Sequence, residues 1–261
     1  MRANRMKAAL AAGRPAVGLS VMIPSPQIVE MAGRLGFDWV LIDCEHGTIT
    51  RETAELMAMA AEAAGTTPIA RPSTNTPEAI LAVLEAGALG VQVPHVGSAA
   101  DARRAVDAVK YHPLGSRGLA AGTRPAGYGF GGSAADYVTA SNRETLVCVQ
   151  IEDTRGLANL PEILDVPGVD VFFVGPSDLA QAMGHPGRSD VPEVRRAIDG
   201  AFRTILGAGK TAGSTGAPEA IPGLVRHGIR YTYTHLTRLL GRAAEEFLRA
   251  AREAGGGGGL V

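Results

Sequence analysis

Short apolar segments alternate along the chain with segments of helical periodicity. The apolar segments contain many β-branched residues, and several show no alternation of polar and apolar positions, as expected for parallel strands buried on both faces. They span residues 17–23, 39–45, 68–72, 90–96, 146–152, 169–176, 211–216 and 229–234. Residues 211–216 are small and polar, so we predict a strand there mainly from its position in the alternation.

Segments with helical periodicity fill the intervals between these strands. They span residues 26–35, 51–64, 77–86, 99–109, 157–164, 192–208, 218–227 and 237–254. Several begin with Ser, Thr or Pro and end near Gly, as helices do. Eight strand–helix units predict an α/β protein with a single (β/α)8 TIM barrel rather than an open sheet.

Two further features complete the predicted fold. An N-terminal helix precedes the first strand, and a connection of about fifty residues separates strands four and five. The middle of this connection, residues 115–132, is rich in Gly, Arg and Pro. A barrel loop of that length usually serves function or assembly. We assign residues 1–254 to one barrel and residues 255–261 to a flexible Gly-rich tail.

The composition argues against several classes of function. Hydrophobic residues make up 46% and charged residues 20% of the chain, which is typical of globular proteins. The formal net charge of −1 gives no sign of a surface for nucleic acid or an anionic membrane. No apolar run reaches about 18 residues, and no convincing signal peptide precedes Gly13. The two cysteines, Cys44 and Cys148, lie far apart, which favours a reduced, cytoplasmic setting.

Polar side chains follow the predicted strands at one end of the barrel. Because barrel active sites lie at the C-terminal ends of the strands, these residues indicate an enzyme. The candidates are Asp43, Glu45, His46, Arg71, Gln92, His95, Gln150, Glu152, Ser177 and Asp178. Each alone has a simpler structural explanation, since an acid at a strand end more often caps a helix or faces water.

The residue types point to enolate chemistry on a 2-oxo acid. Glu152 and Asp178 end neighbouring strands and could share a hard divalent cation such as Mg²⁺ or Mn²⁺. Arg71 could hold carbonyl or carboxylate oxygens through its planar fork, and His46 is the candidate general base. Alternation along the strand would point Glu45 away from His46, so we expect a structural role for it.

Residues 36–47 read GFDWVLIDCEHG, which resembles a segment of the HpcH/HpaI aldolases. Five further motifs follow in the order and spacing of that family, at residues 70–72, 93–94, 111–118, 149–152 and 174–179. The resemblance covers residues 3–250 and implies a metal-dependent class II aldolase, a carbon–carbon lyase. Named members cleave 4-hydroxy-2-oxoheptanedioate or 2-dehydro-3-deoxyglucarate.

The resemblance also assigns roles to residues. It implies that Glu152 and Asp178 bind a divalent ion (Mg²⁺, Mn²⁺ or Co²⁺), that His46 is the catalytic base, and that Arg71 contacts the pyruvyl group. The resemblance further implies that Gln150, Ser177 and Asp178 contact the substrate. It also implies that Asp43 lies near the metal-bound waters. The family base is often oriented by an aspartate on the helix after strand three; that position is Glu85 here, and it joins the catalytic candidates.

Two departures concern the rest of the pocket. The first strand often carries a Trp in the family, where this chain has Ser20, which predicts a roomier pocket mouth. Strand eight reads Tyr231-Thr-Tyr-Thr-His-Leu236 in place of a Gly-x-Asp ending. His95, His112 and His235 are further candidates for the pocket wall.

The expected partners are a small-molecule 2-oxo acid and an aldehyde. We expect no nucleotide, no pyridoxal phosphate (PLP) and no Schiff-base lysine, because neither a strand-to-helix phosphate motif nor a lysine at a strand end is present. The resemblance implies a homo-oligomer, a hexamer or trimer of dimers, with the last helix exchanged between neighbours. Two alternatives stay open: a same-fold condensing enzyme that uses oxaloacetate or another donor, in the manner of a citrate synthase or a biosynthetic ligase, and a non-catalytic barrel that binds 2-oxo acids.

Overall fold

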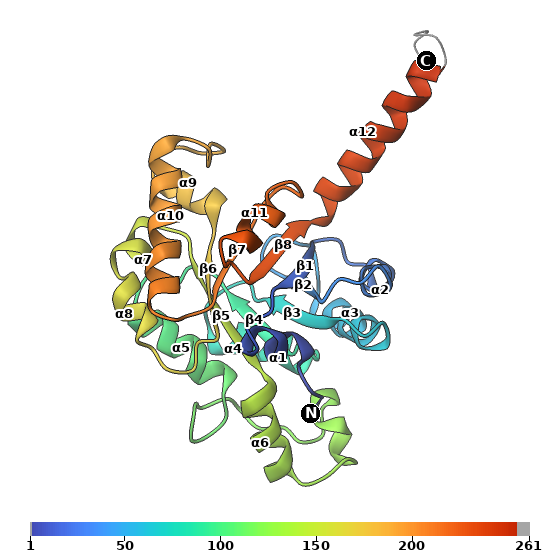
Figure 1. The fold of residues 1–261 in the computed structure, drawn as a ribbon. Helices are drawn as coiled ribbons and strands as arrows, with labels where there is room; N and C mark the ends of the chain where they lie inside the picture. Colours follow the sequence, from blue (N-terminus) through green and yellow to red (C-terminus); the bar gives the residue numbers. More distant parts are fainter. Residues whose placement is uncertain (1, 255–261) are drawn as a thin grey trace.

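Eight parallel strands close into a barrel surrounded by helices (Figure 1). This computed structural model describes residues 2–254, so the predicted tail 255–261 lies outside the described residues. Each strand pairs with the next in sequence, and β8 closes the ring on β1. The strands are β1 (Ala16–Val21), β2 (Trp39–Asp43), β3 (Thr67–Arg71), β4 (Gly90–Val93), β5 (Leu146–Ile151), β6 (Val171–Val174), β7 (Ala212–Thr215) and β8 (Tyr231–His235). The predicted (β/α)8 fold is confirmed.

Helices connect successive strands and cover the outside of the barrel. They are α1 (Arg5–Ala11), α2 (Pro26–Arg34), α3 (Arg51–Ala63), α4 (Pro77–Glu85), α5 (Ala99–Val109), α6 (Ala134–Glu144), α7 (Thr154–Ala158), α8 (Leu160–Leu164), α9 (Pro176–Ala182), α10 (Pro192–Gly207), α11 (Ile221–Arg226) and α12 (Leu236–Ala254). A 3₁₀ helix, η1 (Arg124–Gly129), lies between α5 and α6.

Side-chain caps fix where the first four connecting helices begin. Ser25, Thr50, Thr76 and Ser98 each accept a hydrogen bond from the backbone N–H three residues on. Such a cap satisfies one of the N–H groups that lack a partner in the first helical turn. The chain therefore turns into each helix within a few residues of the strand end, so the strand-end side chains stay together at one rim.

Aromatic side chains fill the interior of the barrel. Trp39 packs against Tyr231 with ring centroids 4.2 Å apart, and Phe173 stacks on Tyr233 at 5.4 Å. All four side chains are almost fully buried. Every residue of β2 to β6 is buried as well, which explains why these strands showed no polar alternation. This packing closes the barrel below its C-terminal rim.

The structure differs from the sequence prediction in several details. The long connection between β4 and β5 contains helix α6, whose N-terminus is marked by a capping box of Ser133 and Asp136. Helix α9 was also missed, and the predicted helix 157–164 is the pair α7 and α8, which meet at Asn159. Strand β2 ends at Asp43, two residues before the predicted end.

Helix α12 projects away from the barrel (Figure 1). None of its residues is buried, and the large apolar side chains of Leu240, Phe247 and Leu248 are exposed by 63%, 71% and 41%. The sequence predicts the helix itself. Within residues 2–254, none of the helices combines the length and apolar character that a membrane span requires.

Candidate active site

A buried ion pair joins the ends of β2 and β3. Asp43 and Arg71 are neighbours in the register of the two strands. Arg71 donates to Asp43 twice, from Nε over 3.0 Å and from Nη2 over 2.5 Å. Burial alone would raise the pKa of Asp43, yet the hydrogen bonds and charge of Arg71 hold that pKa below its ordinary value. Asp43 therefore stays ionised and fixes the guanidinium.

The turn after β2 also depends on Asp43. Its Oδ1 accepts hydrogen bonds from the backbone N–H groups of Glu45 and His46, at 3.1 and 3.2 Å. Gly47 ends this turn in close contact with the backbone, since a Cβ there would lie 2.3 Å from the carbonyl oxygen of Asp43. Larger residues would push the turn open, and the side chain of His46 would move with it.

Glu45 lies within this network, and the alternation argument about it was wrong. Its carboxylate is 3.1 Å from Arg71 Nε, 3.1 Å from His95 Nε2 and 3.7 Å from His46 Nε2. Alternation does not apply because β2 ends at Asp43 and residue 45 lies in the turn. Half of the His46 side chain is exposed, so its imidazole faces the open side of the site.

Glu152 is buried immediately after β5, and both of its oxygens accept hydrogen bonds. Oε1 accepts from the backbone N–H of His95 at 2.7 Å, and Oε2 accepts from the amide of Gln150. The ring Nδ1 of His95 also lies 3.1 Å from Oε1. Burial raises the pKa of Glu152, as do the nearby charges of Asp178 and Glu45. This carboxylate is therefore held in place in a setting that favours a nearby positive charge.

A cavity of about 190 Å³ opens at the C-terminal ends of the strands and brings most of the predicted site together. Its walls include six of the eight predicted residues: His46, Arg71, Gln150, Glu152, Ser177 and Asp178. Asp43 lies behind Arg71 as the partner of its guanidinium. Acid, base and guanidinium groups from the ends of four strands, β2, β3, β5 and β6, thus share one enclosure.

Glu85, the remaining predicted residue, does not line this cavity. It ends α4, where its carboxylate pairs with Arg117 Nη2 at 2.7 Å, and both side chains are buried. Because α4 runs back from the site rim to the start of β4, its last residue lies near the opposite end of the barrel. Within one chain, the predicted contact between Glu85 and His46 is therefore not formed, and His46 lies instead 3.7 Å from the carboxylate of Glu45.

The cavity has walls that the sequence did not reveal. Phe173, Thr215 and Tyr233 line it from β6, β7 and β8, together with His235, which was only a candidate for the pocket wall. Burial, with the charges of Arg238 and Arg71, lowers the pKa of His235 to about 4. A neutral imidazole thus faces the cavity at neutral pH. These wall residues were hard to predict from the sequence, because only closure of the barrel brings β8 to the site.

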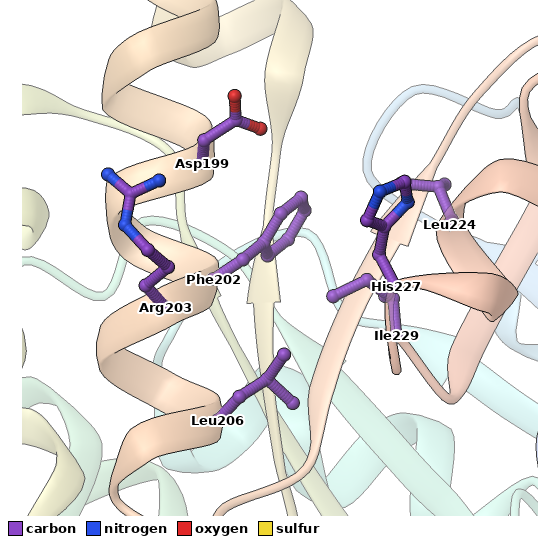
Figure 2. A pocket seen from close by; sticks show the side chains of 7 residues that line it. All are labelled: Asp199, Phe202, Arg203, Leu206, Leu224, His227 and Ile229. Atoms are coloured by element: carbon purple, nitrogen blue, oxygen red, sulfur yellow. The ribbon is translucent and has the colours of Figure 1, made fainter.

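A larger cavity of about 320 Å³ lies between α10 and α11 on the outside of the barrel. Figure 2 shows Phe202 and Leu206 of α10 pointing toward the side of Leu224 and Ile229. Asp199, Arg203 and His227 are its polar groups. It lacks the paired carboxylates and the buried guanidinium of the rim cavity, so the rim cavity is the better candidate for chemistry.

Comparison with known proteins agrees with the geometry. The HpcH/HpaI aldolase/citrate lyase family matches residues 17–217. A 4-hydroxy-2-oxo-heptane-1,7-dioate aldolase from Klebsiella pneumoniae is 41% identical over 84% of this chain and 82% of its own length. A hydroxypyruvate/pyruvate aldolase from Deinococcus radiodurans is 39% identical over 92% of this chain and 87% of its own.

Solved structures give the same result. A crystal structure of an HpcH/HpaI aldolase/citrate lyase family protein from Burkholderia cenocepacia superimposes with a TM-score of 0.90 and 29% identity, covering 95% of this chain and 99% of the other. A citrate synthase superimposes with a TM-score of 0.85 and 28% identity, covering 95% and 98%.

Proposed function

This chain belongs to the HpcH/HpaI aldolase/citrate lyase family, and we propose that it is a class II aldolase acting on a pyruvate-type donor and an aldehyde. The observation that carries the proposal is the shared cavity of His46, Arg71, Glu152 and Asp178. Paired carboxylates, a fixed guanidinium and an exposed imidazole are the groups that enolate formation needs.

Glu152 and Asp178 fit a divalent cation. Both line the cavity, and the negative charge of Asp178 adds to burial in raising the pKa of Glu152, which a cation would offset. Gly175 keeps the space beside Glu152 free, since a Cβ there would lie 3.1 Å from Oε2. Within residues 2–254, no group of three or more His, Cys, Asp or Glu side chains is arranged as a metal site, so water and substrate oxygens would complete the coordination.

The groups in the cavity have different proposed roles. A bound Mg²⁺, Mn²⁺ or Co²⁺ supplies Lewis-acid polarisation of the substrate oxygens. Arg71, held by Asp43, places positive charge where the enolate oxygen develops. Ser177 and Asp178 lie in the first turn of α9, where backbone N–H groups lack helical partners and are available to a substrate carboxylate. Gln150 forms part of the cavity wall.

His46 is the proposed general base, and its replacement tests that role. We expect His46→Ala to lower turnover by about 10²–10⁴-fold, because the variant lacks the imidazole that accepts the proton. Divalent metal binding should persist, since His46 is not a proposed ligand. His227→Ala is the matched control, because His227 is exposed on the outside of the barrel. Unchanged turnover in His46→Ala would remove the base from the mechanism.

Proton exchange on pyruvate is the direct test of the function. We expect exchange of the pyruvate methyl protons in D₂O, followed by NMR, to require added Mg²⁺, Mn²⁺ or Co²⁺ and to stop with excess EDTA. The measurement needs no knowledge of the aldehyde. Binding of metal without exchange would contradict pyruvate aldolase activity and would favour the condensing-enzyme alternative, which similarity to a citrate synthase supports. Ligand binding without turnover of any donor would favour a non-catalytic barrel.

We also propose that the protein is a homo-oligomer, a hexamer or trimer of dimers, in which α12 packs on a neighbouring copy. The apolar residues Leu240 and Phe247 are exposed on a helix that has no buried residue in the single chain. We expect Phe247→Glu to lower the molar mass measured by light scattering, whereas Arg249→Ala on the same helix should leave it unchanged. An unchanged mass in Phe247→Glu would contradict a role of α12 in assembly.

A further inference from the structure

Four buried side chains form a chain of hydrogen bonds that ends on Glu152. The hydroxyl of Tyr231 donates to Gln92 Oε1 over 2.9 Å, and Gln92 Nε2 donates to Gln150 Oε1 over 2.5 Å. The amide of Gln150 donates in turn to Glu152 Oε2. All four residues are at most 4% exposed, so bulk water does not replace a lost bond.

The chemistry of the groups gives this chain one direction. An ionised carboxylate only accepts hydrogen bonds, so Gln150 must turn its NH₂ group toward Glu152. The carbonyl oxygen of Gln150 then needs a donor, which is the NH₂ group of Gln92. The carbonyl oxygen of Gln92 needs a donor as well, and the hydroxyl of Tyr231 supplies it. Reversing either amide would bring two acceptors together in a buried site.

Packing holds the first donor in place. The ring of Tyr231 packs against Trp39 at a centroid distance of 4.2 Å and makes an edge contact with Phe173 at 6.2 Å. Burial raises the pKa of Tyr231 well above its ordinary value, so the hydroxyl keeps its proton. The donor at the start of the chain is therefore held by packing and is protonated at neutral pH.

We propose that Gln92 and Tyr231 are positioning residues for the cation site: they keep the amide of Gln150 turned so that it donates to Glu152. This inference rests on the proposed function, because it takes Glu152 as a metal ligand. Glu152 Oε1 is already fixed by the backbone N–H of His95. With Oε2 fixed by Gln150, the carboxylate cannot rotate, and its remaining lone pairs are ready for a cation. Hydrogen bonds that orient metal ligands typically change metal affinity about 10–100-fold.

Binding of Mn²⁺ alone, without substrate, tests the proposal by titration with EPR detection of free Mn²⁺. We expect Gln92→Met to raise the Kd for Mn²⁺ about tenfold or more, and Tyr231→Phe to raise it several-fold. Thr232→Val is the matched control. Thr232 is the buried neighbour of Tyr231 on β8, and its hydroxyl has no hydrogen-bond partner among the described residues. The Kd of this variant for Mn²⁺ should therefore not change. Circular dichroism of the metal-free variants checks that they are folded.

A double-variant cycle separates positioning from a general structural effect. If Gln92 acts through Gln150, then Gln92→Met should have little further effect on the Kd once Gln150→Met is present. Independent, additive effects would overturn the proposal, as would unchanged Mn²⁺ affinity in both Gln92→Met and Tyr231→Phe. If Gln92→Met fails to fold, Tyr231→Phe alone decides. Failure of the unaltered protein to bind Mn²⁺ would overturn the metal-dependent function together with this inference.

Discussion

Glu152→Gln is expected to abolish metal-dependent proton exchange on pyruvate while leaving the protein folded. The substitution removes one of two proposed carboxylate ligands and puts an NH₂ group among groups that already donate to this position, the N–H of His95 and the amide of Gln150. We expect Mn²⁺ affinity and the exchange rate each to fall by at least about 10²-fold, which corresponds to roughly 2.7 kcal/mol or more.

The stability of the same variant should not fall together with its activity. Burial and the neighbouring carboxylates raise the pKa of Glu152 in the folded protein. A carboxyl whose pKa rises on folding binds its proton more tightly when folded, so at neutral pH its charge opposes folding. The metal-free variant should therefore unfold at the same temperature as the unaltered protein or higher.

Asp153→Asn is the matched control for Glu152→Gln. It makes the same carboxylate-to-amide change one residue away, where Asp153 caps α7 through Gly156 N–H and Asn caps nearly as well. Metal binding and exchange should be retained. Full activity in Glu152→Gln, measured beside this control, would exclude Glu152 as a required ligand.

The sequence predicts the barrel well because its signals are local and repeated. Strands β2 to β6 are buried on both faces, and many helices start at a Ser or Thr cap, so even the polar β7 can be placed by order alone. Helices α6 and α9 lack a long apolar stripe and were missed, although the capping box at Ser133 was a usable signal. Strand-end residues such as Arg71 and Glu152 were found because barrel geometry gathers strand ends.

Contacts that depend on tertiary structure were harder to predict. The position of Glu45 depends on where β2 ends, and a shift of two residues replaces strand alternation with a turn. The partner of Glu85 depends on the direction of α4, which carries it to Arg117. The hydrogen-bond partners of Gln92 come from two other strands, Gln150 from the adjacent β5 and Tyr231 from β8. Arg117, Gln150 and Tyr231 lie far from Glu85 and Gln92 in sequence, so spacing along the chain carries no information on these contacts.

Arg71→Met is expected to reduce both activity and stability, and a second substitution should separate the two effects. Activity should fall about 10²–10³-fold, because the enolate loses a positioned positive charge. Stability should fall by about 3–5 kcal/mol, because Asp43 is left as a buried, unpaired charge. Chemical denaturation and pyruvate proton exchange measure the two losses on the same samples.

The pH dependence of the stability loss follows from the pKa of Asp43. Arg71 holds that pKa below its ordinary value of 3.8, so the stability that Asp43 contributes is present above that value and is lost as the pH falls through the folded-state pKa. Without Arg71, burial is no longer opposed by that charge and the pKa of Asp43 rises. The stability difference between Arg71→Met and the unaltered protein should therefore be largest near pH 7 and shrink toward pH 4.

Asp43→Asn in the Arg71→Met background removes the buried charge and should restore much of the lost stability. It cannot restore the guanidinium, so the exchange rate should stay low. Activity that returned together with stability would mean that Arg71 has only a structural role. The metal ion would then be the group that stabilises the enolate. Activity that stays low in a stable double variant would separate the catalytic role of Arg71 from its structural one, since folding is then no longer the difference between the proteins.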